Sequence, residues 1–324
     1  MAHIPLSLRS KLVFAFFMVL APILVLLIYR HQEEYQHTKD SILQEQLRTA
    51  VAFGSAVEAE LDQGVSVDKT LAIDPLIRNF ANIHPDELQP YLARYLNLFP
   101  EYADIIIWGA DGKPIAAAVG QKPGEPTLNI PNQPFFREAL SAGTPTISQL
   151  FTSRLMEQPA VAILAPIKDE SGYSIGVVSI LLDICRATSN LQGAQPSQQP
   201  TIFTTDGSCR VVFHSARPGL GWEERDLSRY EPVRLALNQG QFVGIVEGDF
   251  TPEPHLVAAS KTRSYGWVTA VMAPEELVLG PVRLTTLASL GVYLAIVFAA
   301  LALALGFAYT VTRPLGRLIH AMAA

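Results

Sequence analysis

Two long runs of apolar residues lie near the two ends of the chain. Residues 12–29 contain no charged side chain, and residues 284–311 form a longer charge-free run. Each run is long enough to cross a hydrocarbon core of about 30 Å as a helix. Because backbone groups cannot be left unpaired in lipid, a helix is the expected conformation. The pattern therefore predicts two transmembrane helices, 12–29 and 284–311, separated by residues 30–283.

The residues that flank the two runs predict their orientation. Arg9 and Lys11 precede the first run, and Arg313 and Arg317 follow the second. Positive flanking residues favour the cytoplasmic side, so we expect both termini in the cytoplasm and the intervening domain outside. A cleaved signal peptide is the alternative for the first run. Its apolar stretch exceeds the usual length of about 7–15 residues, however, and no small-x-small cleavage site follows it.

Between the runs, the pattern changes from helical to alternating. Apolar residues recur at near-helical spacing over residues 30–61, which predicts a helix that continues out of the first span. Asp74-Pro75 interrupts this pattern, and a second helix is predicted from His84 to Leu96. Residues 102–119 then predict a hairpin, because their β-branched and aromatic residues surround an Asp-Gly pair, a strong turn signal.

The chain then repeats one order of elements. A hairpin with an Asp-Gly turn, a short helix and further strands occur before and after the polar linker 191–200. The predicted helices and strands are 135–140, 159–167 and 174–182 in the first unit, and 231–238, 242–247, 256–261 and 267–272 in the second. We therefore predict an α+β fold: a long N-terminal helix plus two tandem PAS-like antiparallel-sheet units (about 50–190 and 201–273), flanked by two transmembrane helices.

Composition narrows the classes of function. The formal net charge is −6, and no basic patch favours a nucleic-acid partner. The seven histidines are scattered, and no Gly-x-Ser-x-Gly elbow, phosphate-binding loop or Cys-x-x-Cys pair occurs. We predict no cofactor, no metal and no enzymatic activity for this chain. The two cysteines, Cys185 and Cys209, lie in the domain predicted to be outside the membrane, where oxidising conditions permit a disulfide bond. Whether the two form one is left open.

Residues 131–183 contain the best candidate for a binding site. A short aromatic helix, an arginine in a loop (Arg154) and a carboxylate that closes a strand (Asp183) can together enclose a small polar ligand. Each has a purely structural alternative. The aromatic residues can be core, Arg154 can be solvated, and Asp183 can cap a following helix. Trp108 can form the floor of the pocket or fill the sheet.

These pieces, in this order, resemble a double Cache domain, a sensor module of bacterial chemoreceptors, histidine kinases and diguanylate cyclases. The matching segments are residues 133–140 (Gln-Pro-Phe-Phe-Arg-Glu-Ala-Leu), the strand from Gly176 to Asp183, and residues 265–268 (Tyr-Gly-Trp-Val). Residues 312–315 (Thr-Arg-Pro-Leu) resemble the opening of a HAMP linker, so 312–324 are expected to be its start. The resemblance covers residues 30–324, with the sensor itself at 30–282.

The resemblance implies that the membrane-distal unit holds the ligand. Amino-acid-binding members carry an Arg-x-Trp-Tyr pattern at the short helix, a downstream Tyr, and an Asp that binds the ligand ammonium. Here Asp183 matches the Asp, while Gln133, Phe135 and Phe136 replace the Arg, Trp and Tyr. These replacements argue against an α-amino acid, although Arg154 can supply a cation for a carboxylate. The candidate ligand-binding residues are Trp108, Gln133, Phe135, Phe136, Phe151, Arg154 and Asp183.

The expected function is transmembrane signal transduction. A small molecule binds outside, and a signal passes through the second span to a cytoplasmic output domain absent from this chain, which is then a fragment of a longer receptor. The resemblance implies a homodimer in the lipid bilayer of the bacterial inner membrane, with the sensor domain periplasmic or extracellular. Two alternatives remain open: an extracytoplasmic module that binds a protein partner or has a structural role, without a small-molecule ligand, and a membrane-tethered hydrolase.

Overall fold

The longest element is the N-terminal helix α1 (Leu8–Ile73). The computed structural model describes residues 8–119, 133–153, 158–183, 200–247 and 253–322. α1 is longer at both ends than the predicted helix 30–61, and it continues without interruption from the first apolar run. It ends where Asp74-Pro75 was expected to end it. The Asp74 side chain accepts a hydrogen bond from the Leu76 amide (2.8 Å) and caps the short helix α2 (Pro75–Arg78).

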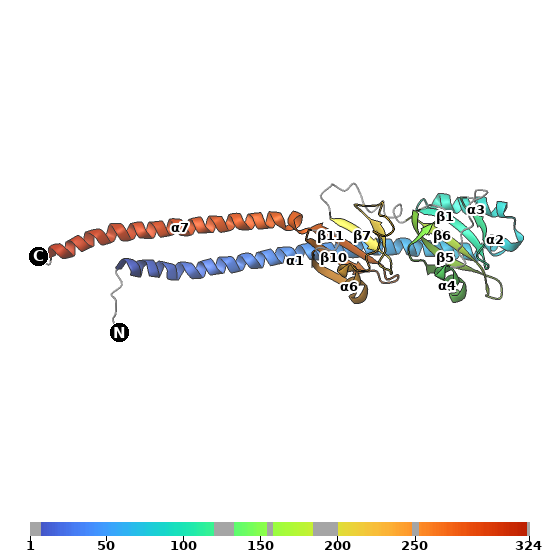
Figure 1. The fold of residues 1–324 in the computed structure, drawn as a ribbon, viewed down its shortest axis with the longest axis horizontal. Coiled ribbons are helices and arrows are strands. Elements are labelled where there is room, and N and C mark those ends of the chain that lie inside the picture. The colour runs from blue at the N-terminus through green and yellow to red at the C-terminus, as the bar shows by residue number, and fades with distance from the viewer. Residues whose placement is uncertain (1–7, 120–132, 154–157, 184–199, 248–252, 323–324) are drawn as a thin grey trace. The chain divides into compact units, whose positions relative to one another are not determined.

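The chain divides into two compact units. Residues 1–42 and 275–324 form one of them, and residues 43–274 form the other. The first consists of the N-terminal part of α1 and of the C-terminal helix α7 (Glu275–Met322) (Figure 1). Large apolar side chains on both helices are exposed, among them Val25, Leu26, Val292 and Phe298. Within the described residues, no helix meets the length and hydropathy needed to cross a membrane.

The second unit contains two antiparallel sheets. One has six strands in the order β2-β1-β6-β5-β3, with β4 also paired to β5. Its strands are β1 (Tyr102–Gly109), β2 (Pro114–Ala117), β3 (Thr146–Ile147), β4 (Phe151–Ser153), β5 (Gln158–Lys168) and β6 (Ser174–Leu182). The helices η1 (Phe80–Asn82), α3 (Pro85–Leu98) and α4 (Pro134–Ala142) accompany it. We call residues 75–183 the first lobe.

The other sheet has five strands in the order β8-β7-β11-β10-β9. Its strands are β7 (Thr201–Thr205), β8 (Val211–His214), β9 (Gln241–Val246), β10 (His255–Lys261) and β11 (Val268–Pro274), accompanied by helix α6 (Glu231–Gln239). We call residues 200–274 the second lobe. In both sheets a hairpin forms one edge: β1 and β2 in the first lobe, β7 and β8 in the second. The last strand of each lobe (β6 or β11) pairs with this hairpin, and the preceding strand (β5 or β10) comes next in the sheet. The predicted tandem repeat of one α+β plan is therefore confirmed.

The part of α1 from residue 43 onward packs against both sheets. Its buried side chains include Phe53, Val57 and Leu61, and they share one apolar cluster with Ile163 of the first lobe and Phe213 of the second. The rings of Phe53 and Phe213 stack with their centroids 5.3 Å apart. The opposite face of each sheet has its own apolar cluster, with α4 in the first lobe and α6 in the second. Helix α1 therefore connects the two lobes through a common core.

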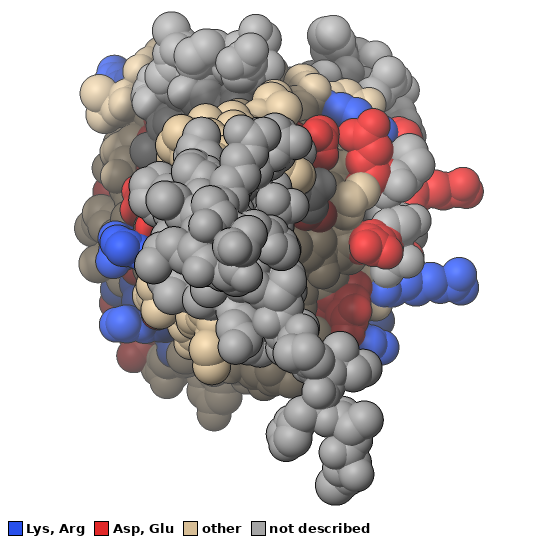
Figure 2. Space-filling view, turned by 90° about the vertical axis from the view of Figure 1, so that its left-hand side faces the viewer, with Lys and Arg blue, Asp and Glu red and all other residues tan. Residues whose placement is uncertain are grey.

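The two tryptophans of the second lobe differ in burial. Trp267 is buried, whereas Trp222 is 39% exposed, and its ring lies under the Arg210 guanidinium at 4.6 Å from the ring centroid. Cys209 is buried and free, and Cys185 lies outside the described residues. On the face drawn in Figure 2, the acidic and basic side chains of the described residues are interspersed, so neither sign of charge dominates that face.

Candidate ligand-binding site

Helix α4 presents the aromatic residues of the candidate site to the sheet of the first lobe. It begins after Gln133, whose backbone is extended, and Pro134 at its first position is already restricted to a helical φ. It ends at Gly143, which has a left-handed φ of 62°. The side chain of Gln133 makes no capping hydrogen bond and is exposed. Gln133 therefore lies at the start of α4, where its amide faces solvent.

Four of the seven predicted residues lie in one cluster. Phe136 and Trp108 are buried, and Phe135 and Phe151 are half-buried beside them. The rings of Phe135 and Phe151 have centroids 5.3 Å apart. The structure therefore brings together aromatic residues from α4, β1 and β4 that are distant in the sequence.

The polar atom of Trp108 is already used inside the sheet. Its Nε1 donates a hydrogen bond to Ser179 Oγ on β6 at 2.7 Å, and Ser179 Oγ is 3.4 Å from the carbonyl of Ile106. The Trp108 side chain is fully buried. Any contact of Trp108 with a ligand would therefore be made by its ring and not by its N–H group.

Phe151 belongs to a strand and not to a loop. Residues 151–153 form β4, in which Phe151 pairs with Ala160 of β5. Sequence patterns did not predict this strand, because three residues are too few to show alternation. Arg154, the next residue, lies outside the described residues, so its predicted role remains a prediction.

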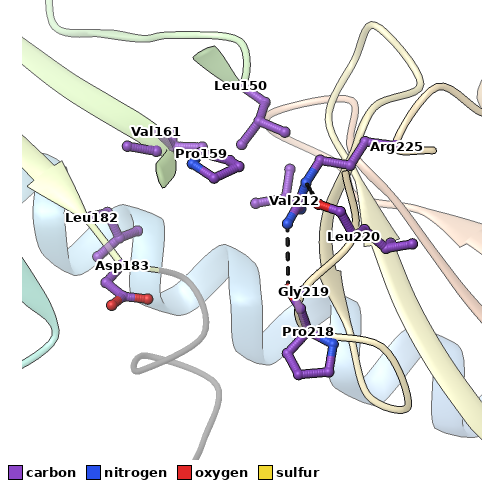
Figure 3. A pocket seen from close by; sticks show the side chains of 11 residues that line it. Leu150, Pro159, Val161, Leu182, Asp183, Val212, Pro218, Gly219, Leu220 and Arg225 are labelled. Carbon is purple, nitrogen blue, oxygen red and sulfur yellow. Dashed lines mark hydrogen bonds between the residues drawn. The ribbon is translucent and has the colours of Figure 1, made fainter. Parts of the chain in front are cut away.

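Asp183 lies where β6 ends, and its side chain lines a pocket between the two lobes. Its backbone amide donates to the carbonyl of Glu101 at 3.1 Å, and its side chain is half-buried. The pocket has a volume of about 410 Å³ (Figure 3). Ala160, the strand partner of Phe151, also lines it. Ala160 therefore lies both in the pocket lining and opposite Phe151 in the sheet, while none of the four aromatic residues of the cluster lines the pocket.

Arg225 is a residue of this pocket that the sequence analysis missed. It is only 6% exposed, and its guanidinium donates to the backbone carbonyls of Val211 (2.7 Å) and Leu220 (3.1 Å). The run Glu223-Glu224-Arg225-Asp226 is typical of a solvated loop, which is why it gave no signal.

A hydrogen bond connects the two lobes beside the same pocket. Asp206 of the second lobe is fully buried, and its Oδ2 accepts a hydrogen bond from the Leu150 amide of the first lobe at 2.8 Å. Its Oδ1 accepts from the amides of Ser208 and Arg210, both at 2.9 Å. Since Leu150 also lines the pocket, the contact between the lobes and the pocket wall share a residue.

Two further acidic residues, Asp104 and Asp68, are buried near the sheet of the first lobe. Burial raises the pKa of Asp104 to about 6, although the amides of Val119, Ile105 and Ala118 oppose this rise. Asp68 of α1 is 0% exposed, and in the described part of the chain neither of its carboxylate oxygens makes a hydrogen bond. Burial raises the pKa of Asp68 well above its usual value, and the backbone of Ala165 opposes the rise only in part. In the described ranges, no group of three metal-ligating side chains occurs.

Solved structures share this fold. The extracellular domain of a proposed histidine kinase, soHK1S-Z6, matches with a TM-score of 0.59 and 15% identity over 76% of this chain and 99% of that chain. The ligand-binding domain of the Campylobacter jejuni chemoreceptor Tlp3 matches in complex with 4-methylisoleucine (TM-score 0.55, 15% identity, 74% of this chain and 94% of that chain). The same domain in complex with L-valine matches with a TM-score of 0.53 and 16% identity, over 75% of this chain and 97% of that chain.

These likenesses confirm the double Cache resemblance stated from the sequence for the sensor region. The matched structures are extracellular sensor domains of the double Cache type, and this chain has their fold. No protein family and no curated protein matches the sequence. At 12–18% identity, the likeness shows the fold, and the chemistry of the site has to be argued from the residues of this chain.

Proposed function

We propose that this chain is the sensor part of a transmembrane receptor, with residues 30–282 outside the membrane and the first lobe farther from it. The observation that carries the proposal is the fold: two repeated lobes pack on one continuous helix, and this fold matches extracellular domains of a histidine kinase and of a chemoreceptor. The signal then passes through residues 284–311 and the HAMP-like start at 312–324 to an output domain beyond this chain.

The two apolar runs support the membrane part of the proposal. Residues 12–29 and 284–311 are free of charges, and several of their large apolar side chains are exposed: Val25 by 67%, Ile296 by 59% and Phe298 by 68%. Apolar surface of this extent is costly in water and is stable in contact with acyl chains. We propose that both runs cross the bilayer with the two termini in the cytoplasm, and that the receptor is a homodimer.

The ligand site of this proposal is the cluster in the first lobe. Phe135 and Phe151 supply aromatic faces, Gln133 an exposed amide, and Trp108 and Phe136 the buried base. Arg154 and Asp183 supply the two charges. The matched Tlp3 domain binds L-valine and 4-methylisoleucine. Because Gln133, Phe135 and Phe136 lack the cation and hydroxyls that an α-amino acid needs, we propose a different small polar ligand with an apolar part.

Signalling requires that the ligand bind one state of the receptor more tightly than another. Helix α1 carries residues of the common core of both lobes, and it continues from the first apolar run. A ligand that changes the packing of the first lobe therefore changes the contacts of α1. Displacements of about 1–2 Å are typical of helices in such switches.

The test is a thermal-shift screen of the full chain in detergent micelles against carboxylates, amines and sugars. A ligand at a hundred times its Kd stabilises the folded state by about 2.7 kcal/mol, which a thermal shift detects. Phe135→Ala and Gln133→Ala should reduce the shift, whereas Tyr173→Ala, 74% exposed in the turn between β5 and β6, should not. A ligand whose shift is equal in all three variants would not bind at this site.

A further inference from the structure

One ionisable residue lies in the buried stripe of α1. Val57, Leu61, Gly64, Asp68 and Leu71 recur at alternating spacings of four and three residues, so they share one face of the helix. All five are buried, and Asp68 is 0% exposed. An apolar residue would suit this position better, because a buried charge is costly. The packing of α1 on the first lobe therefore does not explain why residue 68 is an aspartate.

The groups around Asp68 offer little to a carboxylate. Within the described residues neither of its oxygens has a hydrogen bond of normal geometry, and the nearby backbone of Ala165 in β5 opposes the rise of its pKa only in part. Tyr102 of β1 lies on the same side of α1, with its Oη 3.9 Å from a Cβ placed at Gly64. That hydroxyl is buried and, in the described ranges, has no hydrogen-bond partner either. Two polar side chains are thus buried unsatisfied between α1 and the first lobe.

No cation compensates for the burial of Asp68 in the described part of the chain. The rise in its pKa has burial as its main cause, and no charged side chain contributes to it. The charged residues of α1 between 60 and 73, and those on or beside β1 and β5, are acids or are exposed: Glu60, Asp62, Lys69, Glu101, Asp104 and Lys168. An ionised Asp68 would therefore stay unneutralised in its packed position.

The part of α1 around Asp68 is a weak stretch of helix. Gly64 has a low helix propensity. The hydroxyls of Ser66 and Thr70 each donate a hydrogen bond to the carbonyl four residues earlier, at 2.8 and 2.9 Å. Such contacts slightly destabilise a helix and often bend it. Residues 64–73 therefore depend on their packing against the first lobe to stay helical.

The turns of α1 before this stretch are held on the second lobe by satisfied polar contacts. Glu58 accepts a hydrogen bond from the Ser264 amide, and Asp62 accepts one from the Tyr265 hydroxyl. Both partners lie in the turn between β10 and β11. Helix α1 is therefore fixed by polar contacts up to residue 62, and the weaker stretch that follows contains an unsatisfied acid.

We propose that Asp68 is a proton-operated switch in α1: protonated, it keeps residues 64–73 packed on the first lobe, and ionised, it releases them to water. A carboxylic acid is far less costly to bury than a carboxylate, so the packed state favours the proton. Because α1 continues from the first apolar run, the switch gives the receptor an external proton input. This use rests on the proposed function, whereas the switch itself is a property of the fold and needs no ligand in the aromatic cluster.

Hydrogen exchange of the full chain in detergent micelles, followed from pH 5 to pH 8 without ligand, tests the proposal. Released Asp68 has the ordinary pKa of about 4, and packed Asp68 has a raised one. Between the two values each opening event releases one proton. The protection factors of residues 64–73 should therefore fall about tenfold per pH unit and level off above the folded pKa. At pH 8 they should be at least tenfold lower than those of residues 43–62, which stay packed.

Two substitutions of acids in α1 form a matched pair. Asp68→Asn cannot ionise, so the pH dependence of protection in residues 64–73 should disappear, and protection at pH 8 should rise at least tenfold. Glu45→Gln removes an exposed carboxylate of the same helix and should leave the pH dependence unchanged. Infrared difference spectra give a second readout. The carbonyl stretch of a protonated carboxylic acid should be present in the wild type at pH 5 and missing from Asp68→Asn.

Three results would overturn the proposal. The first is protection of residues 64–73 that does not change with pH. The second is equal protection of residues 64–73 and 43–62 at pH 8, which would mean that Asp68 is exposed only when the whole unit unfolds. The third is a pH dependence that survives in Asp68→Asn. Where Asp68→Asn does not fold, the two segments of the wild type decide alone. Phe135→Ala, which tests the ligand site, should leave all of these measurements unchanged, so failure of the switch is distinguishable from failure of ligand sensing.

Discussion

The two lobes contain the same turn motif in two very different environments. In the first lobe Asp111 of the Asp-Gly turn is exposed, accepts from the Lys113 amide at 3.1 Å and pairs with Lys113 Nζ at 3.1 Å. In the second lobe Asp206 of the matching turn is fully buried and accepts from the Ser208 amide and, across the lobe boundary, from the Leu150 amide. The turn signal predicts the hairpin in both cases, and the tertiary contacts determine whether its carboxylate also joins the lobes.

A second comparison concerns two carboxylates that are equally buried. Asp206 and Asp68 are both 0% exposed. Asp206 accepts hydrogen bonds from three backbone amides and from the Ser208 hydroxyl. Within the described residues Asp68 has no hydrogen bond of normal geometry, and only the nearby backbone of Ala165 lowers its pKa. Burial of a charge is costly unless hydrogen bonds or an opposite charge offset it. Asp206 should therefore stabilise the fold, and Asp68 should destabilise it whenever it is ionised.

The largest expected effect is that of Asp206→Ala. The change leaves three backbone amides of the turn and of Leu150 without their acceptor, so we expect a loss of about 3 kcal/mol in the free energy of unfolding. For a unit of this size that corresponds to a fall in Tm of about 6–12 °C. Circular dichroism during heating measures it. The matched control, Asp111→Ala, should shift Tm far less, and equal shifts would show that the two turns do not differ in role.

Next in size is the effect of pH through Asp68. Its folded pKa is raised, so between the unfolded pKa of about 4 and the folded pKa the native state binds a proton that the unfolded state has lost. Stability should therefore fall as pH rises through this window and level off above the folded pKa. Asp68→Asn should remove this slope and be more stable than the wild type at pH 8 by about 2 kcal/mol. Identical pH profiles of Tm for the two proteins would contradict this.

The smallest effect compares two tryptophans. Trp108→Phe removes the hydrogen bond to Ser179 and part of a buried ring, which should cost about 1.5 kcal/mol. Trp222→Phe in the second lobe changes a side chain that is 39% exposed and should stay within about 0.5 kcal/mol. Thermal unfolding of both variants gives the comparison. A larger loss at Trp222 would mean that its contact with Arg210 contributes more than a surface contact does.

Local patterns predicted the elements of this fold well, because they depend on neighbours in the sequence. Asp74-Pro75 ends α1, and the Asp-Gly pairs form hairpins. Helical spacing also carried a signal that went unused: Asp68 lies in line with Leu61, Gly64 and Leu71, on the buried side of α1. Gly64 shows how close that side is to the sheet, since a Cβ there would lie 2.3 Å from Ile163 Cδ1.

The inter-lobe pocket could not be predicted in this way. Arg225 and Asp183 come from loops and strand ends more than forty residues apart, and only the docking of the lobes brings them to one cavity. The same holds for the hydrogen bond that the Leu150 amide donates to Asp206. Asp183 was identified as a candidate ligand residue from its place at the end of a strand and from the resemblance. Its position in the inter-lobe pocket, however, depends on tertiary contacts that leave no periodicity in the sequence.

The buried acid of α1 also has a calorimetric consequence. Between its unfolded and folded pKa values, Asp68 carries a proton in the native state and releases it to the solvent when the protein unfolds. The buffer takes up that proton, so the enthalpy of buffer protonation, which is the negative of its ionisation enthalpy, contributes to the measured heat. The unfolding enthalpy at one temperature and pH should then differ between two buffers of different ionisation enthalpy, and the difference, divided by that of the buffers, gives the number of protons released.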